Sequence, residues 1–316
     1  MSGGVGRARG WLRAVSAIGV VAAVLALSAC GSNETSLTGR SGSGEVVVGS
    51  GSSPLGEVVA EIYAGALRDA GAKVRTDLGL GAREQYLAAL DGGKVNLVPE
   101  LTGQLLDHYD RGATATEGKA VYEALSRSLP EQLSVSDPAA AEDREALVVT
   151  ETTAHRFDLK SITDLAPHCA QLTLGGPFAV SGSRAGLVGL REVYGCGFEQ
   201  FAGFPLDTAT PDPASADRQL ADALRTDRVQ VAALSTATPE VTADSFVVLQ
   251  DDKSLFPAQN VIPLFRKGAL TADQIKVLDR VAGELTTGDL ADMIGRVQAG
   301  QKPAAVAAEW LPAHGL

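Results

Sequence analysis

The sequence predicts an α/β fold built as two lobes, and three observations support this prediction. Short apolar segments alternate with amphipathic segments of helical period in two separate runs along the chain. Each run contains a glycine-rich turn between a strand and a helix, and three helical segments follow that belong to neither run alone. Because such alternation is typical of parallel sheets covered by helices, we expect two parallel-containing sheets.

The first run begins with "EVVVGSGSSPLGEVVAEIYAGALRDAG", Glu45 to Gly71. We expect a strand at Val46–Val48, a polar turn, and a helix in which apolar residues from Leu55 to Ala66 share one face. The rest of the run predicts a strand in "KVRTDLG", a helix in "AREQYLAALDGG", a strand in "VNLVPE", and helices in "LTGQLLDHYD" and "GKAVYEALSRSLP".

The second run begins with the strand "EALVVT", Glu145–Thr150. A strand in "QLTLGGP" and a helix in "SRAGLVGLREVYG", beginning near Ser183, follow it. The next helix, "PDPASADRQLADALRTD", has Asp212 as a plausible N-cap and Pro213 in its first turn, and "VQVAALS" is the following strand. The chain then continues through the strands "FVVLQDD" and "NVIPLFR" into three helices, "TADQIKVLDRVAGELT", "TGDLADMIGRVQAG" and "PAAVAAEWL".

This order predicts a first lobe of residues 45–145 plus 247–316 and a second lobe of residues 146–246. Two strands would then cross between the lobes, and two connections between rigid bodies form a natural hinge. A ligand is expected in the central cleft, where both glycine turns lie at the carboxyl ends of their strands.

Residues 1–29 have the character of a secretory signal, because three arginines precede the uncharged apolar run Ala14–Leu27, which is short for a membrane span. The run ends in Leu27-Ser28-Ala29-Cys30, which resembles a bacterial lipobox, so Cys30 is the expected lipidated first residue of the mature chain. The alternative is a secreted soluble protein in which Cys30 is incidental. Residues 30–44, rich in Gly and Ser, form the expected tether, with a root-mean-square span of about 20 Å.

Removal of the signal leaves 24 Lys and Arg against 38 Asp and Glu, a net charge of −14. Such an acidic chain argues against nucleic acid as a partner, because phosphate binding needs a basic patch. Broad adsorption to anionic lipid is disfavoured for the same reason.

Two cysteines remain after Cys30, and outside the cytoplasm Cys169 and Cys196 most simply form a disulfide. A zinc site is a poor alternative, because no CxxC or HxxxH spacing accompanies them. His168 adjoins Cys169, but a Cys–His nucleophile would need a free thiol. We therefore expect no metal and no cofactor.

The first glycine turn, "GSGSSPLG", fits neither a nucleotide site nor a nucleophile turn. It lacks the lysine of a phosphate loop, a GxGxxG in the right frame, and the GxSxG spacing of hydrolases. No paired acid, base and nucleophile follow, so we expect no enzyme. Backbone N–H groups and the hydroxyls of Ser50, Ser52 and Ser53 could instead hold a polar solute at the helix start.

Five segments in order resemble one family over nearly the whole mature chain, Glu45 to Leu316. They are "VVVGSGSSPLGEVVAEIYAGALRDAGAKV", "LGAREQYLAALDGGKVNLVPELTGQLL", "EALVVTETTAHRFDLKSITDLA", "RAGLVGLREVYG" and "FVVLQDDKSLFPAQNVIPLF". The family is the glycine betaine/carnitine/choline-binding proteins of osmoprotectant ABC transporters (ProX/OpuC-like substrate-binding lipoproteins). The resemblance implies a type II periplasmic-binding-protein fold that closes on a small solute and delivers it to a membrane permease. This role agrees with the separately expected lipid anchor on the outer face of the cell membrane. One tether and one cleft give no reason to expect an oligomer, so we expect a monomer.

Family members hold a quaternary ammonium in a box of tyrosines, and this sequence departs from the family at those places. Leu101 stands in "PELTGQ", Arg144 in "DREALV", and Ser235 and Thr236 follow the strand where the family often has a tyrosine. Arg184 remains where the family tends to carry an arginine. Loss of three aromatic contacts of about 0.5–2 kcal/mol each leaves little affinity for a betaine. We therefore expect a neutral or anionic polar solute, with a hydroxylated or aromatic body.

The residues expected to contact this solute are Ser50, Ser52, Ser53, Gln85, Leu101, Thr102, Gln104, Arg144, Arg184, Ser235 and Thr236. Several alternatives stay open. Arg144 and Arg184 could form hinge salt bridges with Glu145 or another acid, and tyrosines on the helices could pack in the core. Aromatic residues from elsewhere in the chain could still hold glycine betaine or choline, or the protein could be a sensor or adaptor that feeds no transporter.

Overall fold

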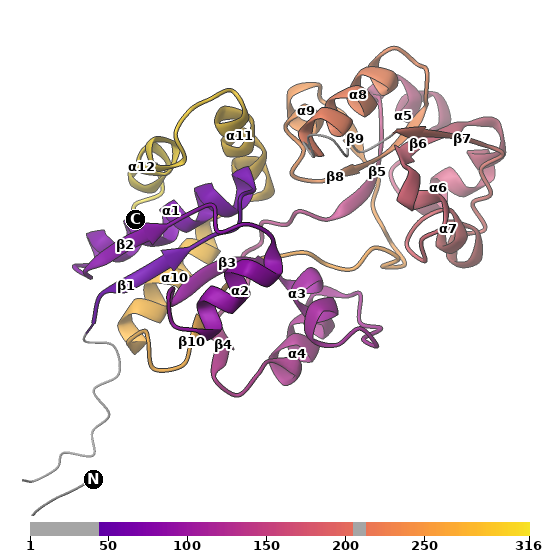
Figure 1. Ribbon diagram of the computed structural model, residues 1–316. Helices are drawn as coiled ribbons and strands as arrows, with labels where there is room; N and C mark the ends of the chain where they lie inside the picture. Colours follow the sequence, from indigo (N-terminus) through magenta and orange to yellow (C-terminus); the bar gives the residue numbers. More distant parts are fainter. Residues whose placement is uncertain (1–43, 205–212) are drawn as a thin grey trace, which may run out of the picture. The chain divides into compact units, whose positions relative to one another are not determined.

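The computed structural model describes residues 44–204 and 213–316. The expected signal, Cys30, the tether up to residue 43 and the Asp212 N-cap lie outside these residues. The described residues belong to one compact unit that carries two five-stranded sheets (Figure 1). The α/β fold class with two parallel-containing sheets is therefore confirmed.

The first sheet has the strand order β2-β1-β3-β10-β4. Its strands are β1 (Val46–Gly49), β2 (Val74–Asp77), β3 (Leu97–Leu101), β4 (Leu133–Val135) and β10 (Val261–Arg266). The first three run parallel, whereas β10 runs antiparallel to both of its neighbours. The antiparallel strand is therefore β10, which enters the first sheet after the chain has passed through the second sheet.

Helices cover both faces of the first sheet because its strands alternate apolar side chains between the faces. Val46 and Val48 pack with α1, α10, α11 and α12, whereas Val47 packs with α2, α3 and α4 (Figure 1). These helices are α1 (Pro54–Asp69), α2 (Arg83–Asp91), α3 (Thr102–Tyr109), α4 (Gly118–Ser128), α10 (Ala272–Glu284), α11 (Thr287–Gln298) and α12 (Pro303–Ala313). The three terminal helices thus complete the core of the first sheet.

The second sheet has the strand order β7-β6-β8-β5-β9. Its strands are β5 (Glu145–Val149), β6 (Thr173–Pro177), β7 (Gln200–Phe204), β8 (Val231–Ser235) and β9 (Val247–Val248). The first three in this order are parallel, and β5 is antiparallel to both β8 and β9. In each sheet, therefore, four strands run in one direction and the strand in fourth position, β10 or β5, runs in the opposite direction.

The second sheet is also covered on both faces. Leu147 and Val149 pack with α5, α6, η1 and α7, whereas Val148 packs with α8 and α9. The helical segments are α5 (Glu151–Phe157), α6 (Ile162–Leu165), η1 (Ala166–Gln171), η2 (Phe178–Ser181), α7 (Leu187–Tyr194), α8 (Pro213–Arg225) and α9 (Pro239–Ala243). The expected disulfide between Cys169 and Cys196 is present within the first of these layers.

Two local features differ from expectation. The helix expected to begin near Ser183 begins at Leu187, because a turn precedes it in which a Cβ on Gly186 would overlap the carbonyl of Val180. Strand β9 pairs with β5, and Leu249 and Phe256 belong to the core of the second sheet. The return into the first sheet thus occurs about ten residues later than the expected boundary at residue 247.

Candidate functional site

Two segments of chain cross between the sheets and pair with each other. The first leads from β4 to β5 and the second from β9 to β10. The N–H of Asp143 donates to the carbonyl of Gln259 at 3.0 Å, and the N–H groups of Ala139 and Val261 donate to carbonyls on the opposite segment at 2.8 and 2.9 Å. The crossing is therefore a short antiparallel ribbon, as a two-connection hinge requires.

The second crossing segment carries "SLFPAQN" and contacts the start of α3. The side chain of Gln259 accepts from the N–H of Gln104 at 2.9 Å, and the N–H of Asn260 donates to the hydroxyl of Thr102 at 3.0 Å. Thr102 also donates to the carbonyl of Ala258 at 3.3 Å and is 1% exposed. Thr102 therefore links the segment before β10 to the start of α3, and its hydroxyl already has both a donor and an acceptor within the protein.

The carboxylate of Glu100 is the centre of a polar cluster at the carboxyl end of β3. Arg83, at the start of α2, donates to both oxygens of Glu100 at 3.1 and 3.2 Å and to the side chain of Gln104 at 2.7 Å. The hydroxyl of Tyr86 and the N–H of Leu101 add bonds of 2.7 and 3.1 Å. Burial raises the pKa of the Tyr86 phenol, and neighbouring Glu100 raises it further. Exposed Gln104 is thus held beside Arg83. The buried Glu100 carboxylate accepts four hydrogen bonds, and the Arg83 guanidinium balances its charge.

A second polar cluster lies where the first crossing segment meets the end of β8. The guanidinium of Arg144 pairs with Glu142 at 3.1 Å, and its Nε is buried without a hydrogen-bond partner. The hydroxyl of Thr236 accepts from the N–H of Arg144 and donates to the carbonyl of Glu142, each at 3.0 Å. Ser235 donates to the carboxylate of Asp143. The structure thus brings Arg144, Ser235 and Thr236 together.

Carboxylates outnumber cations in this second cluster. Burial raises the pKa of Asp143, partly offset by the hydrogen bond from Ser235, and burial also raises the pKa of Glu145. Burial raises the pKa of Asp217 on α8 to about 6; the Thr238 hydroxyl and Arg218 oppose this rise, whereas Asp143 and Glu240 add to it. One oxygen of Glu145 is buried without a hydrogen-bond partner. Several acids therefore lie at the hinge end of the second sheet, and burial favours the neutral form of Asp143, Glu145 and Asp217.

The remaining predicted residues have varied surroundings. Ser50 is fully buried, with its hydroxyl 3.4 Å from the N–H of Gly79, and Ser53 caps α1 by accepting from the N–H of Gly56 at 3.0 Å. Gln85 accepts from the N–H of Ala82 at 2.7 Å. Leu101 is 7% exposed and packs in the first core. Ser52 and Arg184 are exposed.

Sequence reasoning considered Glu145 as a hinge partner but did not single out the other acids of the two clusters. Glu100 terminates the apolar strand "VNLVPE", and a charged residue at a strand's carboxyl end was an available signal. Glu142 and Arg144 stand two residues apart in an extended segment, where side chains share a face. Asp217 gave no comparable signal, because its partners come from distant parts of the sequence.

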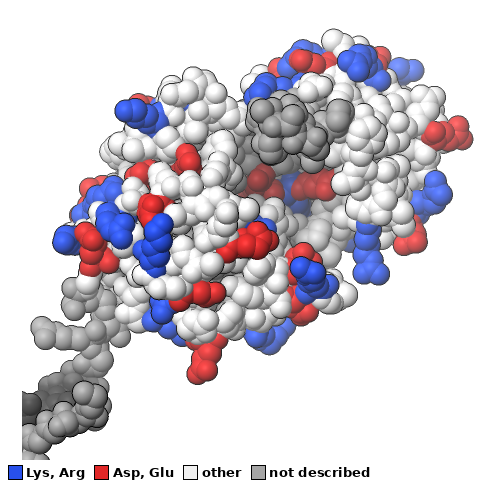
Figure 2. Space-filling view, in the orientation of Figure 1, with Lys and Arg blue, Asp and Glu red and all other residues white. Residues whose placement is uncertain are grey.

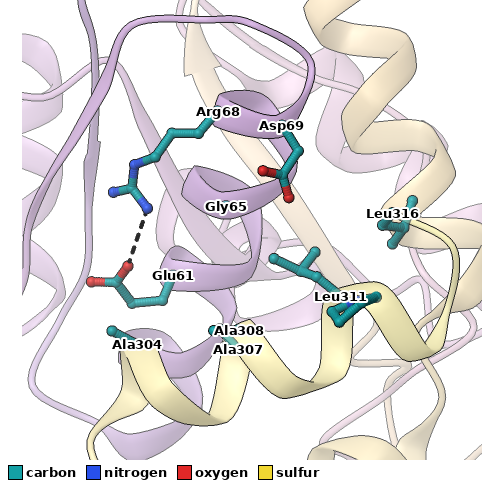
Figure 3. A pocket seen from close by; sticks show the side chains of 10 residues that line it. Glu61, Gly65, Arg68, Asp69, Ala304, Ala307, Ala308, Leu311 and Leu316 are labelled. Carbon is teal, nitrogen blue, oxygen red and sulfur yellow. Dashed lines mark ion pairs between the residues drawn. The ribbon is translucent and has the colours of Figure 1, made fainter.

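A hollow of about 340 Å³ lies apart from both polar clusters. It lies between α1 and α12, where Gly65 and Ala308 allow the helices to approach and Arg68 lies 3.8 Å from Glu61 (Figure 3). It contains none of the residues predicted to contact solute. On the face drawn in Figure 2, acidic and basic side chains are interspersed and form no broad basic field.

Within residues 44–204 and 213–316, no helix has the length and apolar character of a membrane span. In the same ranges, no group of three or more His, Cys, Asp and Glu side chains is placed to hold a metal ion.

Comparison with solved structures supports the fold. A glycine betaine/carnitine/choline ABC transporter protein superposes with a TM-score of 0.76 at 21% identity, covering 85% of this chain and 98% of that one. Apo YehZ from Escherichia coli gives 0.74 at 21% identity, covering 86% and 99%. Lactococcal OpuAC, closed on glycine betaine, gives 0.52 at 15% identity, covering 85% and 96%. No curated protein matches this sequence.

The family model described as the substrate binding domain of ABC-type glycine betaine transport systems matches residues 44–313. Its members are extracytoplasmic solute-binding proteins rather than enzymes, and they work with ABC permeases. This chain belongs to that family.

Proposed function

We propose that this chain is the solute-binding lipoprotein of an ABC importer of the osmoprotectant type. In this proposal residues 1–29 are removed as a signal, Cys30 carries the lipid, and residues 30–44 tether a monomeric domain to the outer face of the cell membrane. The observation that supports it best is the paired crossing between the two sheets, since a two-connection hinge suits a protein that closes on a solute. The division into two lobes, with the return into the first lobe after Phe256, and the predicted contact residues are part of the same proposal.

The solute is proposed to bind without a tyrosine cage. Leu101 is packed in the core, and Thr236 uses its hydroxyl within the hinge. Arg184 is exposed and makes no ion pair within residues 44–204 and 213–316, so it is free to bind a carboxylate on a neutral or anionic polar solute.

A second solute class has its own support. Arg144 pairs with Glu142, so its charge is balanced before any solute arrives, and Asp143, Glu145 and Asp217 leave the surroundings acidic. Such surroundings favour a cationic or zwitterionic solute, including glycine betaine or choline held by aromatics other than the tyrosine box.

Titration calorimetry of the full chain in a non-ionic detergent tests the binding role. The panel contains glycine betaine, choline, carnitine, proline, neutral polyols and hydroxylated aromatic acids. Saturable binding of one member supports the role, and the member that binds decides the solute class. A folded protein that binds none of them would contradict the proposal.

Transport itself needs a separate test, because a sensor or adaptor could share the fold. Deletion of this gene should abolish uptake of the solute that binds, and the wild-type chain should restore it. A Cys30→Ala chain should leave the membrane fraction if lipid is the anchor. Normal uptake after the deletion would favour the sensor or adaptor.

A further inference from the structure

The turn between β8 and α9 carries a small apolar residue that packs outside its own sheet. Ala237 comes two residues after Ser235, the last residue of β8 in the second sheet. It is 2% exposed and belongs to the apolar core of the first sheet, together with Leu290 and Met293 of α11. The start of α9 is therefore attached to the first sheet as well as to the second.

A glycine on α11 leaves the space for this attachment. A Cβ built on Gly295 would lie 3.2 Å from Cβ and 3.5 Å from Cγ of Pro239, which is the first residue of α9. The Pro239 ring therefore lies directly against the backbone of α11. Because the nearer distance is shorter than an ordinary van der Waals contact, even an alanine at position 295 would push α9 and α11 apart.

Hydrogen bonds join both helices to the first crossing segment. The N–H of Thr236 donates to the carbonyl of Arg144 at 2.8 Å, and the Thr236 hydroxyl bonds to the backbone of Arg144 and Glu142. The N–H of Glu142 donates to the hydroxyl of Thr287, the first residue of α11, at 3.1 Å. The first crossing segment, the start of α9 and α11 therefore contact one another pairwise and form one junction between the sheets.

The second crossing segment passes from one core to the other within three residues. Phe256 is buried in the core of the second sheet, and Ala258 is buried in a core of the first sheet. Only Pro257 separates them, so bending of this segment is confined to the backbone around one residue. Two bodies joined at two places rotate about the line through those places. The angle between the sheets therefore depends on the junction at α9 and α11.

We infer that the contact of Pro239 with Gly295 sets the resting angle between the two lobes and, through it, the fraction of the chain that is ready to bind solute. The inference rests on the proposed function and its division into two lobes. Neither residue is among those predicted to contact the solute. Both are positioning residues, which act on affinity through the arrangement of the lobes.

Distances between spin labels, measured by double electron–electron resonance on the full chain in detergent, report the angle. The labels are attached at Asp107→Cys on α3 and Glu192→Cys on α7, which are both exposed positions. A Cys30→Ala background leaves no other free thiol, because Cys169 and Cys196 are joined in a disulfide.

Gly295→Leu should shift the mean label distance by about 2 Å or more, because the spacing of packed helices varies by about 2 Å with the side chains at the contact. Pro239→Ala removes the ring and should shift the distance in the opposite direction. Two matched controls should keep the wild-type distance. Gly288→Leu changes an exposed glycine of the same helix, and Pro303→Ala changes the first residue of α12.

Calorimetry with the panel member that binds the wild-type chain reports the effect on affinity. Apparent affinity scales with the fraction of the protein in the binding-competent arrangement, so Gly295→Leu and Pro239→Ala should change it in opposite directions, each by about threefold or more. The two control variants should bind as the wild-type chain does.

Circular dichroism first establishes that each variant is folded, and Gly295→Ala, with a smaller shift in the same direction, replaces Gly295→Leu if the leucine variant does not fold. Wild-type distances in both contact variants overturn the inference, as does an equal shift in Gly288→Leu. Shifted distances with unchanged affinity overturn the part that concerns binding. If the distances shift as expected but no panel member binds, the proposed function fails while the effect of the contact on the lobe angle stands.

Discussion

The guanidinium of Arg83 lies against the carboxylate of Glu100 in a two-point contact, with Nε 3.1 Å from one oxygen and Nη2 3.2 Å from the other. The Glu100 side chain is 1% exposed and that of Arg83 is 26% exposed. The pair fixes the start of α2 to the end of β3. Because the acid is buried and the base is not, loss of the base is the damaging change.

Arg83→Ala should lower the free energy of unfolding by about 2–4 kcal/mol, because it leaves a buried carboxylate with only the Tyr86 and Leu101 donors. Arg83→Lys keeps the charge but loses the planar two-point geometry, so we expect a smaller loss of about 1–2 kcal/mol. Urea unfolding at pH 7 measures both. Values within 0.5 kcal/mol of wild type, roughly the range of neutral surface changes, would show that the pair contributes little.

A second prediction concerns the close approach of "SLFPAQN" to α3. A Cβ on Gly103 would lie 2.5 Å from the carbonyl oxygen of Ala258 and 2.9 Å from Nε2 of Gln259. Gly103→Ala should therefore destabilise the protein by about 1–3 kcal/mol, as overpacking does. Gly283→Ala is the matched control, because nothing lies within 4 Å of its Cβ and alanine favours the helix interior. Thermal unfolding should move in opposite directions for the two variants.

Much of the fold was predictable because its strands and helices carry strong local periodicity. Val46–Gly49 and Val261–Arg266 are apolar runs that match buried strands. Strands β4 and β7 were missed because Leu133–Val135 is only three residues long and Gln200–Phe204 has glycine and glutamine within it. Their pairing depends on neighbouring strands rather than on their own pattern.

The candidate site was less predictable because its contacts are long in sequence. Arg144 lies in the first crossing segment, and the charge of its guanidinium is balanced by Glu142. Thr236 meets Arg144 across 92 residues, and the Asp217 environment combines α8 with Thr238, Asp143 and Glu240. A pattern along the chain shows residue types at these positions, whereas their pKa values depend on burial that only packing creates.

The disulfide gives a third prediction. Cys169 and Cys196 are 27 residues apart and both lie in the core beside α6 and α7. Closing a loop of that length stabilises the folded state by about 3–4 kcal/mol on the chain-entropy estimate. Dithiothreitol should therefore lower the urea midpoint of the wild-type chain. A Cys169→Ala/Cys196→Ala chain should show a low midpoint with and without the reductant, and a midpoint that still responded would point to another reducible bond.

The last prediction follows from Asp217. Burial raises the pKa of this carboxyl to about 6 in the folded chain, against about 3.9 for an unfolded aspartate. The folded state therefore binds the proton more tightly, so this group's stabilising contribution is fully present below about pH 4 and is lost as pH rises through about 6. The difference is on the order of 3 kcal/mol.

Asp217→Asn should remove this part of the pH dependence and raise stability at pH 7, because asparagine can still accept from the Thr238 hydroxyl and carries no charge. Urea unfolding between pH 4 and pH 7.5 measures the slope. Asp222→Asn, on the same helix but exposed, is the control and should keep the wild-type slope. If Asp217→Asn also kept that slope, the proton taken up near pH 6 would belong to another group, of which Asp143 and Glu145 are the first to replace.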